Sequence, residues 1–172
     1  MTTGWNQRPY VGRFQLDNPI ERGGMSVIWK GADVHNQRPV AIKFLQTHET
    51  TDSRFRRRFH AEVEVMARMT HPGVVAVYDA GELGDERAES LVGLSADTPY
   101  LVMEFVDGEV AGEYLTGATW PKMRNFLEEV LQALAYVHSH GIVHRDPKPS
   151  NIPLARAHNH RTHPTLIHFD IP

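Results

Sequence analysis

The sequence predicts an α+β fold, in which a five-stranded antiparallel sheet with one helix precedes a mainly helical part. Short runs rich in β-branched and aromatic residues fill the N-terminal part of the chain. After Asp107-Gly108 the apolar residues recur at the three- and four-residue steps of a helix. With 172 residues, 41% hydrophobic and 23% charged, the chain has the bulk of one globular domain or of part of a larger one.

Three of the strands form a meander, because their β-rich runs are separated by turn-forming residues. They are predicted at 14–20, 27–31 and 40–45. A helix follows over 54–69, where Phe55, Phe59 and Val63 keep the helical period, and His71-Pro72-Gly73 ends it. The last two strands are predicted at 74–78 and 100–106, with an acidic loop over 81–99 between them.

A second long helix begins at Trp120-Pro121 and ends at Gly141. Its apolar residues form one stripe: Phe126, Leu127, Val130, Leu131, Leu134 and Val137. Beyond Ile142 the chain is rich in proline, and we expect irregular structure there.

Composition excludes several classes of function. Eighteen basic and 21 acidic side chains give a net charge of -3, so no overall positive field indicates a nucleic-acid partner. The chain has no cysteine, which fits a reducing cytoplasm. Since no apolar run reaches the roughly 20 residues that span a bilayer, we expect no membrane segment and a cytoplasmic location.

The Gly-containing stretch at 20–28 lies between two predicted strands, where backbone N–H groups can approach phosphate oxygens. By itself it also fits an ordinary tight hairpin. Lys43, in Val40-Ala41-Ile42-Lys43, is a lysine among apolar neighbours and needs an anionic partner or a route to solvent. Glu62, on the following helix, is the candidate partner, and the pair would hold the ammonium group near nucleotide phosphates.

The order of the glycine loop, Val-Ala-Ile-Lys, the helix glutamate and His144-Arg145-Asp146 resembles the protein-kinase signature. The stretches 71–79 and 100–108 look like the bacterial branch of the eukaryotic-type Ser/Thr kinases. The resemblance covers about Phe14 to Pro172. It implies a kinase-like fold, with the sheet as the N-lobe and the helical part as the beginning of the C-lobe.

The resemblance also implies roles for individual residues. Catalysis would involve Asp146 as the acceptor of the substrate hydroxyl proton, Lys148 at the transferring phosphoryl group and Asn151 at a metal ion, with His144 and Arg145 in support. Residues of the ATP site would be Ile20, Gly23, Gly24, Met25, Ser26, Ile28, Ala41, Lys43, Glu62, Met103, Glu104 and Val106. The implied cofactors are ATP and Mg²⁺, with Mn²⁺ as the alternative metal.

Five positions depart from the family pattern. Glu21 replaces the first glycine of the phosphate loop, which adds a Cβ and a carboxylate near phosphates. Pro147 follows Asp146, and Pro153 falls in the short strand expected after Asn151; each removes a backbone donor. His168 stands where the metal-binding aspartate belongs, and an imidazole suits a hard ion such as Mg²⁺ poorly. Asp170 lies two residues further on, in the place of a glycine.

The organisation that follows is an N-terminal extension at 1–13, an N-lobe at 14–105, and a hinge with a partial C-lobe at 106–172. The expected function is transfer of the ATP γ-phosphoryl group to Ser or Thr hydroxyls of a protein substrate, impaired in this chain because of His168 and because the activation segment would follow Pro172. The alternatives are a pseudokinase-like module that binds a nucleotide or a partner, and a broken coding sequence.

Overall fold

The computed structural model describes residues 9–46, 52–84, 93–156 and 162–167. The chain forms two compact units. The sheet unit consists of residues 1–57 and 78–105, and the helical unit of residues 58–77 and 106–172. The helical unit therefore takes a stretch from the middle of the chain as well as everything after Phe105. The expected division into lobes at 14–105 and 106–172 remains a proposal.

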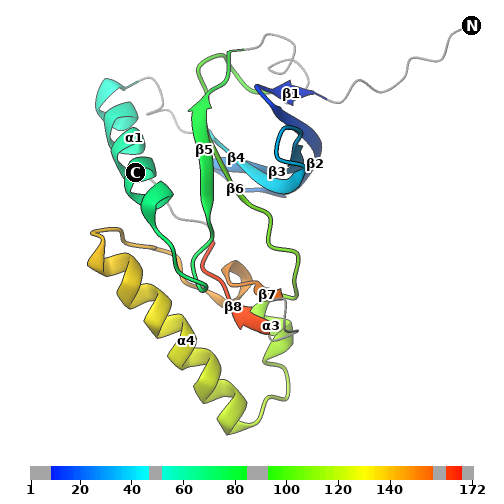
Figure 1. Ribbon diagram of the computed structural model, residues 1–172, viewed down its shortest axis with the longest axis vertical. Helices are drawn as coiled ribbons and strands as arrows, with labels where there is room; N and C mark the ends of the chain where they lie inside the picture. The colour runs from blue at the N-terminus through cyan, green and yellow to red at the C-terminus, as the bar shows by residue number, and fades with distance from the viewer. Residues whose placement is uncertain (1–8, 47–51, 85–92, 157–161, 168–172) are drawn as a thin grey trace, which may run out of the picture. The chain divides into compact units, whose positions relative to one another are not determined.

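The sheet unit is built on a six-stranded sheet with the order β1-β2-β3-β4-β6-β5 (Figure 1). Its strands are β1 (Tyr10–Val11), β2 (Phe14–Arg22), β3 (Ser26–Asp33), β4 (Arg38–Leu45), β5 (Val77–Glu82) and β6 (Pro99–Glu104). The pairs β1–β2, β2–β3, β3–β4 and β4–β6 are antiparallel. The sequence predicted five strands; the sixth is the two-residue β1, which is too short to give a periodic signal.

The two faces of this sheet carry different residues, because side chains alternate along each strand. On one face a hydrophobic core forms around Val40, Ile42 and Phe44 of β4, none of which is accessible to solvent. Val27 and Trp29 of β3 belong to the same core. Burial of each large side chain contributes at most about 1.5–3 kcal/mol to stability. The residues between these positions point to the opposite face.

Asp33 fixes the turn between β3 and β4. Its carboxylate is buried and accepts hydrogen bonds from the backbone N–H of His35 at 3.2 Å and from the Nδ2 of Asn36 at 2.7 Å. Arg13 also donates to this carboxylate, at 3.3 Å. Burial alone would raise the pKa of Asp33, but the hydrogen bonds from Asn36 and Arg13 outweigh it and lower the pKa to about 2. The turn is therefore organised around a permanent negative charge.

Helix α1 (Ser53–Arg68) confirms the helix predicted at 54–69. Asp52 caps it, because its carboxylate accepts the N–H of Arg54 at 2.8 Å and its carbonyl accepts the N–H of Arg56 at 3.1 Å. The predicted apolar positions Phe55 and Phe59 are buried, with 5% and 1% of their surface exposed. The helix thus forms where the three- and four-residue period indicated.

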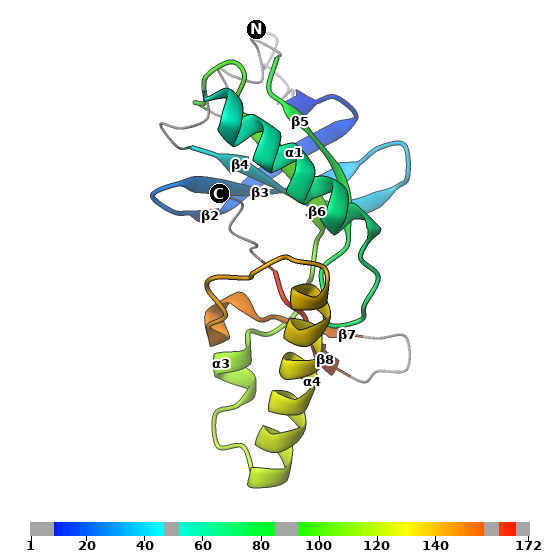
Figure 2. The same ribbon diagram turned by 90° about the vertical axis from the view of Figure 1, so that its left-hand side faces the viewer.

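The helical unit is arranged around one long helix (Figure 2). Besides the part of α1 from Arg58 onward, its elements are α3 (Ala111–Tyr114), α4 (Trp120–Ser139), the 3-10 turn η2 (Pro149–Asn151), β7 (Leu154–Arg156) and β8 (Thr162–Pro164). Pro121 lies in the first turn of α4, and Gly141, at φ +77°, follows its end. Both ends of the predicted helix are confirmed.

The predicted apolar stripe of α4 divides into two parts. Phe126, Val130 and Val137 are buried, together with Ala133. Leu127 and Leu131, in contrast, are 44% and 63% exposed. The exposed side of α4 therefore carries two large apolar side chains, where a solvated helix face usually carries polar ones.

Two predictions about secondary structure were wrong, and a third needs its boundary moved. The strand expected at 74–78 lies at Val77–Glu82, because the backbone of Val74 and Val75 pairs with Leu166 instead of with the sheet. The region after Ile142 is not wholly irregular, since β7 and β8 form an antiparallel pair. The short strand expected after Asn151 is present as β7, but it begins at Leu154, so Pro153 precedes the strand and makes a bridge with Val110.

Among the described residues, none of the helices combines the length and the apolar character that crossing a bilayer requires.

Candidate functional site

Four of the predicted nucleotide-binding residues share the sheet face opposite the hydrophobic core. Ile28 lies opposite Lys43 across β3 and β4, and Ala41 lies opposite Met103 across β4 and β6. Residues two apart in a strand point the same way, so Ala41 and Lys43 lie side by side on this face. All four are buried, including Lys43, which is only 4% exposed.

The glycine loop connects β2 to β3. The N–H of Gly23 donates to the carbonyl of Ser26 at 2.8 Å, and the carbonyl of Met25 accepts the N–H of Gln46 at 2.7 Å. Ile20 and Met25 are 47% and 66% exposed. Glu21, the residue that replaces the expected first glycine, is paired with Ile28 in the β2–β3 ladder and is exposed.

The two glycines of this loop are not required by the fold. A Cβ added to Gly24 would meet no atom within 4 Å, and one added to Gly23 would meet only the carbonyl oxygen of Ser26, at 3.6 Å. Neither glycine has a positive φ. Since neither packing nor backbone conformation explains them, the open backbone here is free for close approach by another molecule.

In the helical unit, the predicted catalytic residues Asp146, Lys148 and Asn151 form one cluster. The Nζ of Lys148 donates to Oδ2 of Asp146 at 2.6 Å. The Nδ2 of Asn151 donates to the same oxygen at 3.0 Å and to the backbone carbonyl of Asp146 at 3.1 Å. The 3-10 turn η2 places Asn151, since its N–H donates to the carbonyl of Lys148 at 2.8 Å.

This cluster keeps Asp146 ionised. The hydrogen bond from Lys148 is the largest effect and lowers the pKa of Asp146; burial, the next largest, raises it, and the charge of Lys148 and the hydrogen bond from Asn151 lower it further, so that the pKa stays below its ordinary value. Pro147 does not prevent the arrangement, because the N–H of Lys148 still donates to the carbonyl of Asp146 at 3.0 Å. The carboxylate is partly exposed, with 45% of its side-chain surface accessible. It can therefore meet a proton donor from outside.

His144 and Arg145, the predicted supporting pair, behave differently from each other. His144 is 1% exposed, and its Nε2 lies 2.6 Å from the carbonyl oxygen of Ile167. Arg145 is exposed and adopts φ +69°, a conformation that a residue with a Cβ rarely takes and that stores strain. This kink separates the buried imidazole from the partly exposed carboxylate of Asp146.

Glu62 lies on the part of α1 that belongs to the helical unit. Burial raises its pKa, and the charges of Arg145 and Arg58 partly offset this effect. Lys43, its predicted partner, belongs to the sheet unit. The Lys43–Glu62 pair stays a prediction.

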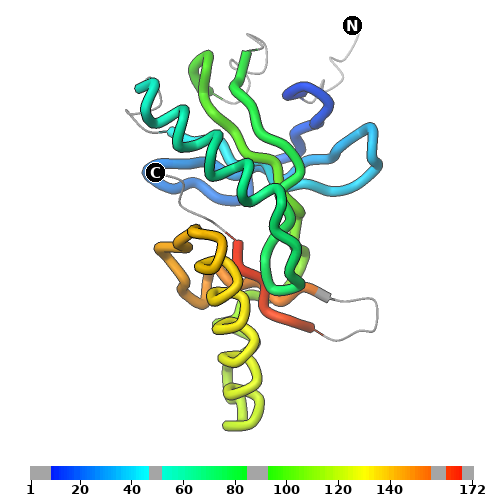
Figure 3. The backbone as a smooth tube through the Cα atoms, turned by 60° about the vertical axis from the view of Figure 1, so that its left-hand side comes forward, coloured from blue at the N-terminus to red at the C-terminus, as the bar shows by residue number. Residues whose placement is uncertain are grey.

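The segment that leads to His168 is anchored within the helical unit. The N–H of Leu166 donates to the carbonyl of Gly73 at 2.8 Å, and the N–H of Val75 donates to the carbonyl of Leu166 at 3.0 Å. The two stretches run side by side (Figure 3). His168 and Asp170 themselves lie outside the described residues.

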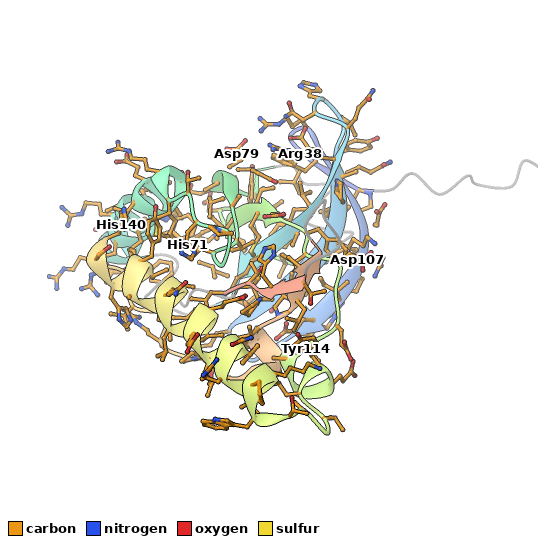
Figure 4. The ribbon with its side chains drawn as sticks, turned by 60° about the horizontal axis from the view of Figure 1, so that its bottom comes forward. Arg38, His71, Asp79, Asp107, Tyr114 and His140 are labelled. Atoms are coloured by element: carbon orange, nitrogen blue, oxygen red, sulfur yellow. The ribbon has the colours of Figure 1, made fainter. Side chains whose placement is uncertain are left out.

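The turn at Gly73 depends on His71. Its Nδ1 accepts the N–H of Gly73 at 3.0 Å, and its ring stacks on Tyr136 with the centroids 4.9 Å apart. The hydroxyl of Tyr136 accepts the N–H of Thr70 at 2.9 Å. His140, which directly follows α4, packs on the same tyrosine with the ring centroids 4.5 Å apart. Figure 4 labels both histidines.

The structure therefore gathers the predicted residues into two sets, one in each unit. The sheet unit holds Ile20, Gly23, Gly24, Met25, Ser26, Ile28, Ala41, Lys43, Met103 and Glu104. The helical unit holds Glu62, Val106, Asp146, Lys148 and Asn151. Sequence reasoning missed Ile167 and Tyr136. A backbone carbonyl leaves no signal in the sequence, and Tyr136 looked like one more position of a helix.

The chain carries a lysine buried in an antiparallel sheet and a loop that holds an ionised aspartate against a lysine and an asparagine. Both are features of the protein-kinase signature. The chain belongs to the protein kinase domain family, whose pattern it matches over residues 14–170. The resemblance stated from the sequence is thereby confirmed.

Two of the curated proteins that the chain resembles are bacterial Ser/Thr kinases. The chain is 38% identical over 144 residues to serine/threonine-protein kinase PrkC of Bacillus subtilis, covering 82% of this chain and 20% of that protein. It is also 38% identical over 144 residues to serine/threonine-protein kinase PknA of Mycobacterium tuberculosis, covering 82% of this chain and 32% of that protein. The chain thus spans a fifth to a third of the length of these two relatives.

The crystal structure of the Mycobacterium tuberculosis PknI kinase domain is similar to this chain, with a TM-score of 0.71 and 25% sequence identity. The alignment covers 98% of this chain and 64% of that kinase domain. The kinase-like fold class is confirmed, with six strands in place of five.

Proposed function

We propose that this chain is the ATP-binding and catalytic part of a protein Ser/Thr kinase, and that its transfer step is impaired. The observation that carries the proposal is the cluster in which Lys148 and Asn151 hold the ionised carboxylate of Asp146. The family supplies the reaction class. The same proposal includes a protein substrate, lobes at 14–105 and 106–172, and a cytoplasmic location, where ATP is available.

In this reaction a Ser or Thr hydroxyl oxygen attacks the γ-phosphorus of ATP, and the bond from that phosphorus to the β–γ bridging oxygen breaks to release ADP. Asp146 accepts the hydroxyl proton, which its ionised state allows. Lys148 brings a positive charge next to the group that gains negative charge. Asn151 keeps the carboxylate of Asp146 in position through its two hydrogen bonds.

ATP would bind at the predicted residues of the sheet unit. Ile28, Ala41 and Met103 provide an apolar surface for adenine on the sheet face that also carries Lys43. Gly23 and Gly24 support the placement of phosphates, because the backbone there is open without being required by the fold. Glu21 opposes it, since its carboxylate repels phosphate charge.

The metal of this family is divalent, and we propose Mg²⁺ with Mn²⁺ as the alternative. The Nδ2 of Asn151 is engaged with Asp146, so the amide presents its Oδ1, an oxygen ligand that suits a hard cation. No group of three or more His, Cys, Asp or Glu side chains in the described part of the chain could hold a metal ion. When bound, the metal would neutralise phosphate charge. The expected weakness is His168, which replaces a carboxylate by an imidazole.

A catalytically inactive module that binds a nucleotide or a partner is the second candidate. The specific observation in its favour is His168, because loss of a carboxylate ligand weakens metal binding more than it weakens adenine binding.

Two measurements test these proposals. ATP with Mg²⁺ or Mn²⁺ should raise the melting temperature of the chain, and Lys43→Met should remove that shift, while Lys122→Met, in the helical unit and outside the predicted site, keeps it. Phosphotransfer to a generic basic protein should be weak and should disappear in Asp146→Asn. Absence of any nucleotide-dependent shift with either metal would contradict the kinase proposal and the nucleotide-binding form of the second candidate, and vigorous transfer would contradict the impairment.

A further inference from the structure

Helix α4 packs one side against the helical unit and leaves apolar residues of another side accessible. Figure 1 shows α3 and the β7–β8 pair along one side of the helix. The buried side consists of Phe126, Val130, Ala133 and Val137. The large apolar residues that stay accessible are Trp120, Leu127 and Leu131, with 71%, 44% and 63% of their surface exposed. None of these residues belongs to the predicted catalytic or ATP-binding sets.

The accessible residues Trp120, Leu127 and Leu131 form one patch, which we call the α4 patch. An α-helix turns by about 100° per residue, so the three positions lie within about 40° of one another around α4. The centre of the patch is roughly 110° away from the centre of the buried side. From Trp120 to Leu131 the patch is about 17 Å long. Three aligned apolar side chains on a face that solvent reaches are typical of an interaction surface.

Two opposite charges flank the α4 patch, on the edge that faces away from the buried side. The Nε of Arg124 lies 3.6 Å from Oε1 of Glu128, and the two side chains are 60% and 59% exposed. A pair as exposed as this one contributes little to stability, so both charges are available for a second contact. Along the chain the cation comes before the anion. A helix that runs in the opposite direction with the same two charges would present an anion to the cation and a cation to the anion.

We propose that the α4 patch is the interface of a homodimer, in which the α4 helices of two copies pack antiparallel about a two-fold axis. Such an axis pairs each position with another one and the second with the first. An axis beside position 126 places Arg124 opposite the partner's Glu128. The same axis places Trp120 opposite the partner's Leu131, because the midpoints of the two pairs of positions differ by only half a residue.

This register satisfies the charged and the apolar residues together. Leu127 lies next to the axis and packs against the partner's Leu127, so the three apolar positions of each copy are covered. Parallel packing would place Arg124 beside the partner's Arg124, and like charges directly opposite each other are unfavourable. The complementarity of the α4 face with itself is therefore specific to the antiparallel arrangement, which identifies a second copy of this chain as the occupant.

The first experiment measures the mass of the whole chain by sedimentation equilibrium without nucleotide, so the result does not depend on the proposed kinase function. A patch of about 17 Å is short for a stable interface, and we expect a dissociation constant between about 10 μM and 1 mM. The mass should rise from one chain toward two across that range, and Leu131→Gln should stay monomeric. Val143→Gln, which removes a 57% exposed apolar side chain outside the patch, is the matched control and should dimerise.

A chain that stays monomeric up to about 1 mM overturns the proposal, and the α4 patch then serves a different occupant. Aggregates of undefined size, or an equal effect of Leu131→Gln and Val143→Gln, also overturn it, because they indicate unspecific association of apolar surface.

Exchange of the two charges tests the register. Arg124→Glu and Glu128→Arg should each weaken the dimer by roughly tenfold, because like charges then face each other. An equal mixture of these two variants should dimerise as the unmodified chain does, since every facing pair again has opposite signs. The double variant Arg124→Glu/Glu128→Arg, which keeps the net charge, should dimerise equally well. If neither the mixture nor the double variant recovers the dimer, the antiparallel register is wrong.

Single cysteines give a direct readout that holds even where a charge variant fails to fold. The chain has no cysteine, so an introduced one reports its own position. Leu127→Cys, next to the axis, should form a disulfide-linked dimer under mild oxidation. Trp120→Cys should not, because its two copies would lie about 18 Å apart along the helices. Equal cross-linking at both positions, or none at position 127, overturns the proposal.

Discussion

The side-chain Nδ2 of Asn151 donates hydrogen bonds to two oxygens of Asp146, the carboxylate Oδ2 at 3.0 Å and the backbone carbonyl at 3.1 Å. Asn151 is 7% exposed, whereas the carboxylate that it supports is nearly half accessible. A buried side chain thus determines the position of an accessible reactive group. Because the same amide also binds the backbone, movement of the carboxylate is coupled to movement of the loop.

The first prediction concerns this contact. Asn151→Ala should lower the free energy of unfolding by about 1 kcal/mol or more, because a buried amide and its hydrogen bond to the Asp146 carbonyl are lost. Urea denaturation followed by circular dichroism measures the change. Ser150→Ala, at the exposed neighbouring position of η2, serves as the control and should stay within about 0.5 kcal/mol of the unmodified chain. Equal effects of the two substitutions would show that Asn151 does not support the loop.

The second prediction concerns the charge of Asp146. Since the hydrogen bond from Lys148 is the main cause of the lowered pKa, Lys148→Met should raise the pKa of Asp146 toward its ordinary value. Carbon-13 NMR titration of the aspartate carboxyls measures it. Lys30→Met, in the sheet unit, should leave that pKa unchanged. An unchanged value in Lys148→Met would mean that the 2.6 Å contact does not persist in solution.

The third prediction is a dependence of stability on pH that is due to His71. Burial lowers the pKa of His71 below 6.5, so the unfolded chain takes up a proton more readily than the folded chain does. The contribution of His71 is complete above pH 6.5 and is lost as the pH falls from there toward the lower folded-state pKa. Protonation also removes the acceptor at Nδ1 that binds the N–H of Gly73.

Urea denaturation between pH 7 and pH 5 tests this prediction by comparison with His71→Gln, which should show a shallower loss of stability. The difference between the two proteins isolates His71 from Glu62, whose raised pKa acts in the opposite direction. His138→Gln, at an exposed position of α4, is the control. Parallel pH profiles for the unmodified chain and His71→Gln would exclude the proposed role of the His71 ring.

The fourth prediction contrasts two glycines that are close in the sequence. A Cβ at Gly108 would lie 2.1 Å from the backbone oxygen of Leu154, whereas one at Gly112, in α3, would meet nothing within 4 Å. Gly108→Ala should therefore destabilise the chain by about 1–3 kcal/mol. Gly112→Ala should be neutral or stabilise by up to about 1 kcal/mol through helix propensity. Thermal unfolding of both variants decides the matter, and equal melting temperatures would contradict the close approach of 108 to β7.

Much of the fold could be predicted because its signals are local. The strands around Lys43 and the long helix after Trp120 follow periodicity and turn residues, and both are confirmed. The start of β5 could not be read in this way. Val74 and Val75 look like the beginning of a strand, but the backbone of Leu166, far away in the sequence, pairs with them. Of the β7–β8 pair, only the short strand after Asn151 was expected, and that came from the family resemblance. Strand β8 was missed because it has three residues and proline lies within it.

The same distinction applies to the candidate site. Asp146, Lys148 and Asn151 are near neighbours in the chain, so a short motif is enough to predict that they form a cluster. The contact of His144 with the Ile167 carbonyl joins distant positions and involves a backbone atom. Arg145 at φ +69° carries no signal at all, since arginine is an uncommon residue for that conformation.

Strand β4 places Val40, Ile42 and Phe44 in the core and Ala41 and Lys43 on the other face. Inserting or deleting one residue in this strand would exchange the two sets, moving the ammonium group into the hydrocarbon core. Length changes inside β4 should thus be eliminated during evolution even where single substitutions survive. Across related sequences, gaps should collect in the turn at 34–37 and be absent from 38–45, a record of the alternation that depends on neither nucleotide binding nor catalysis.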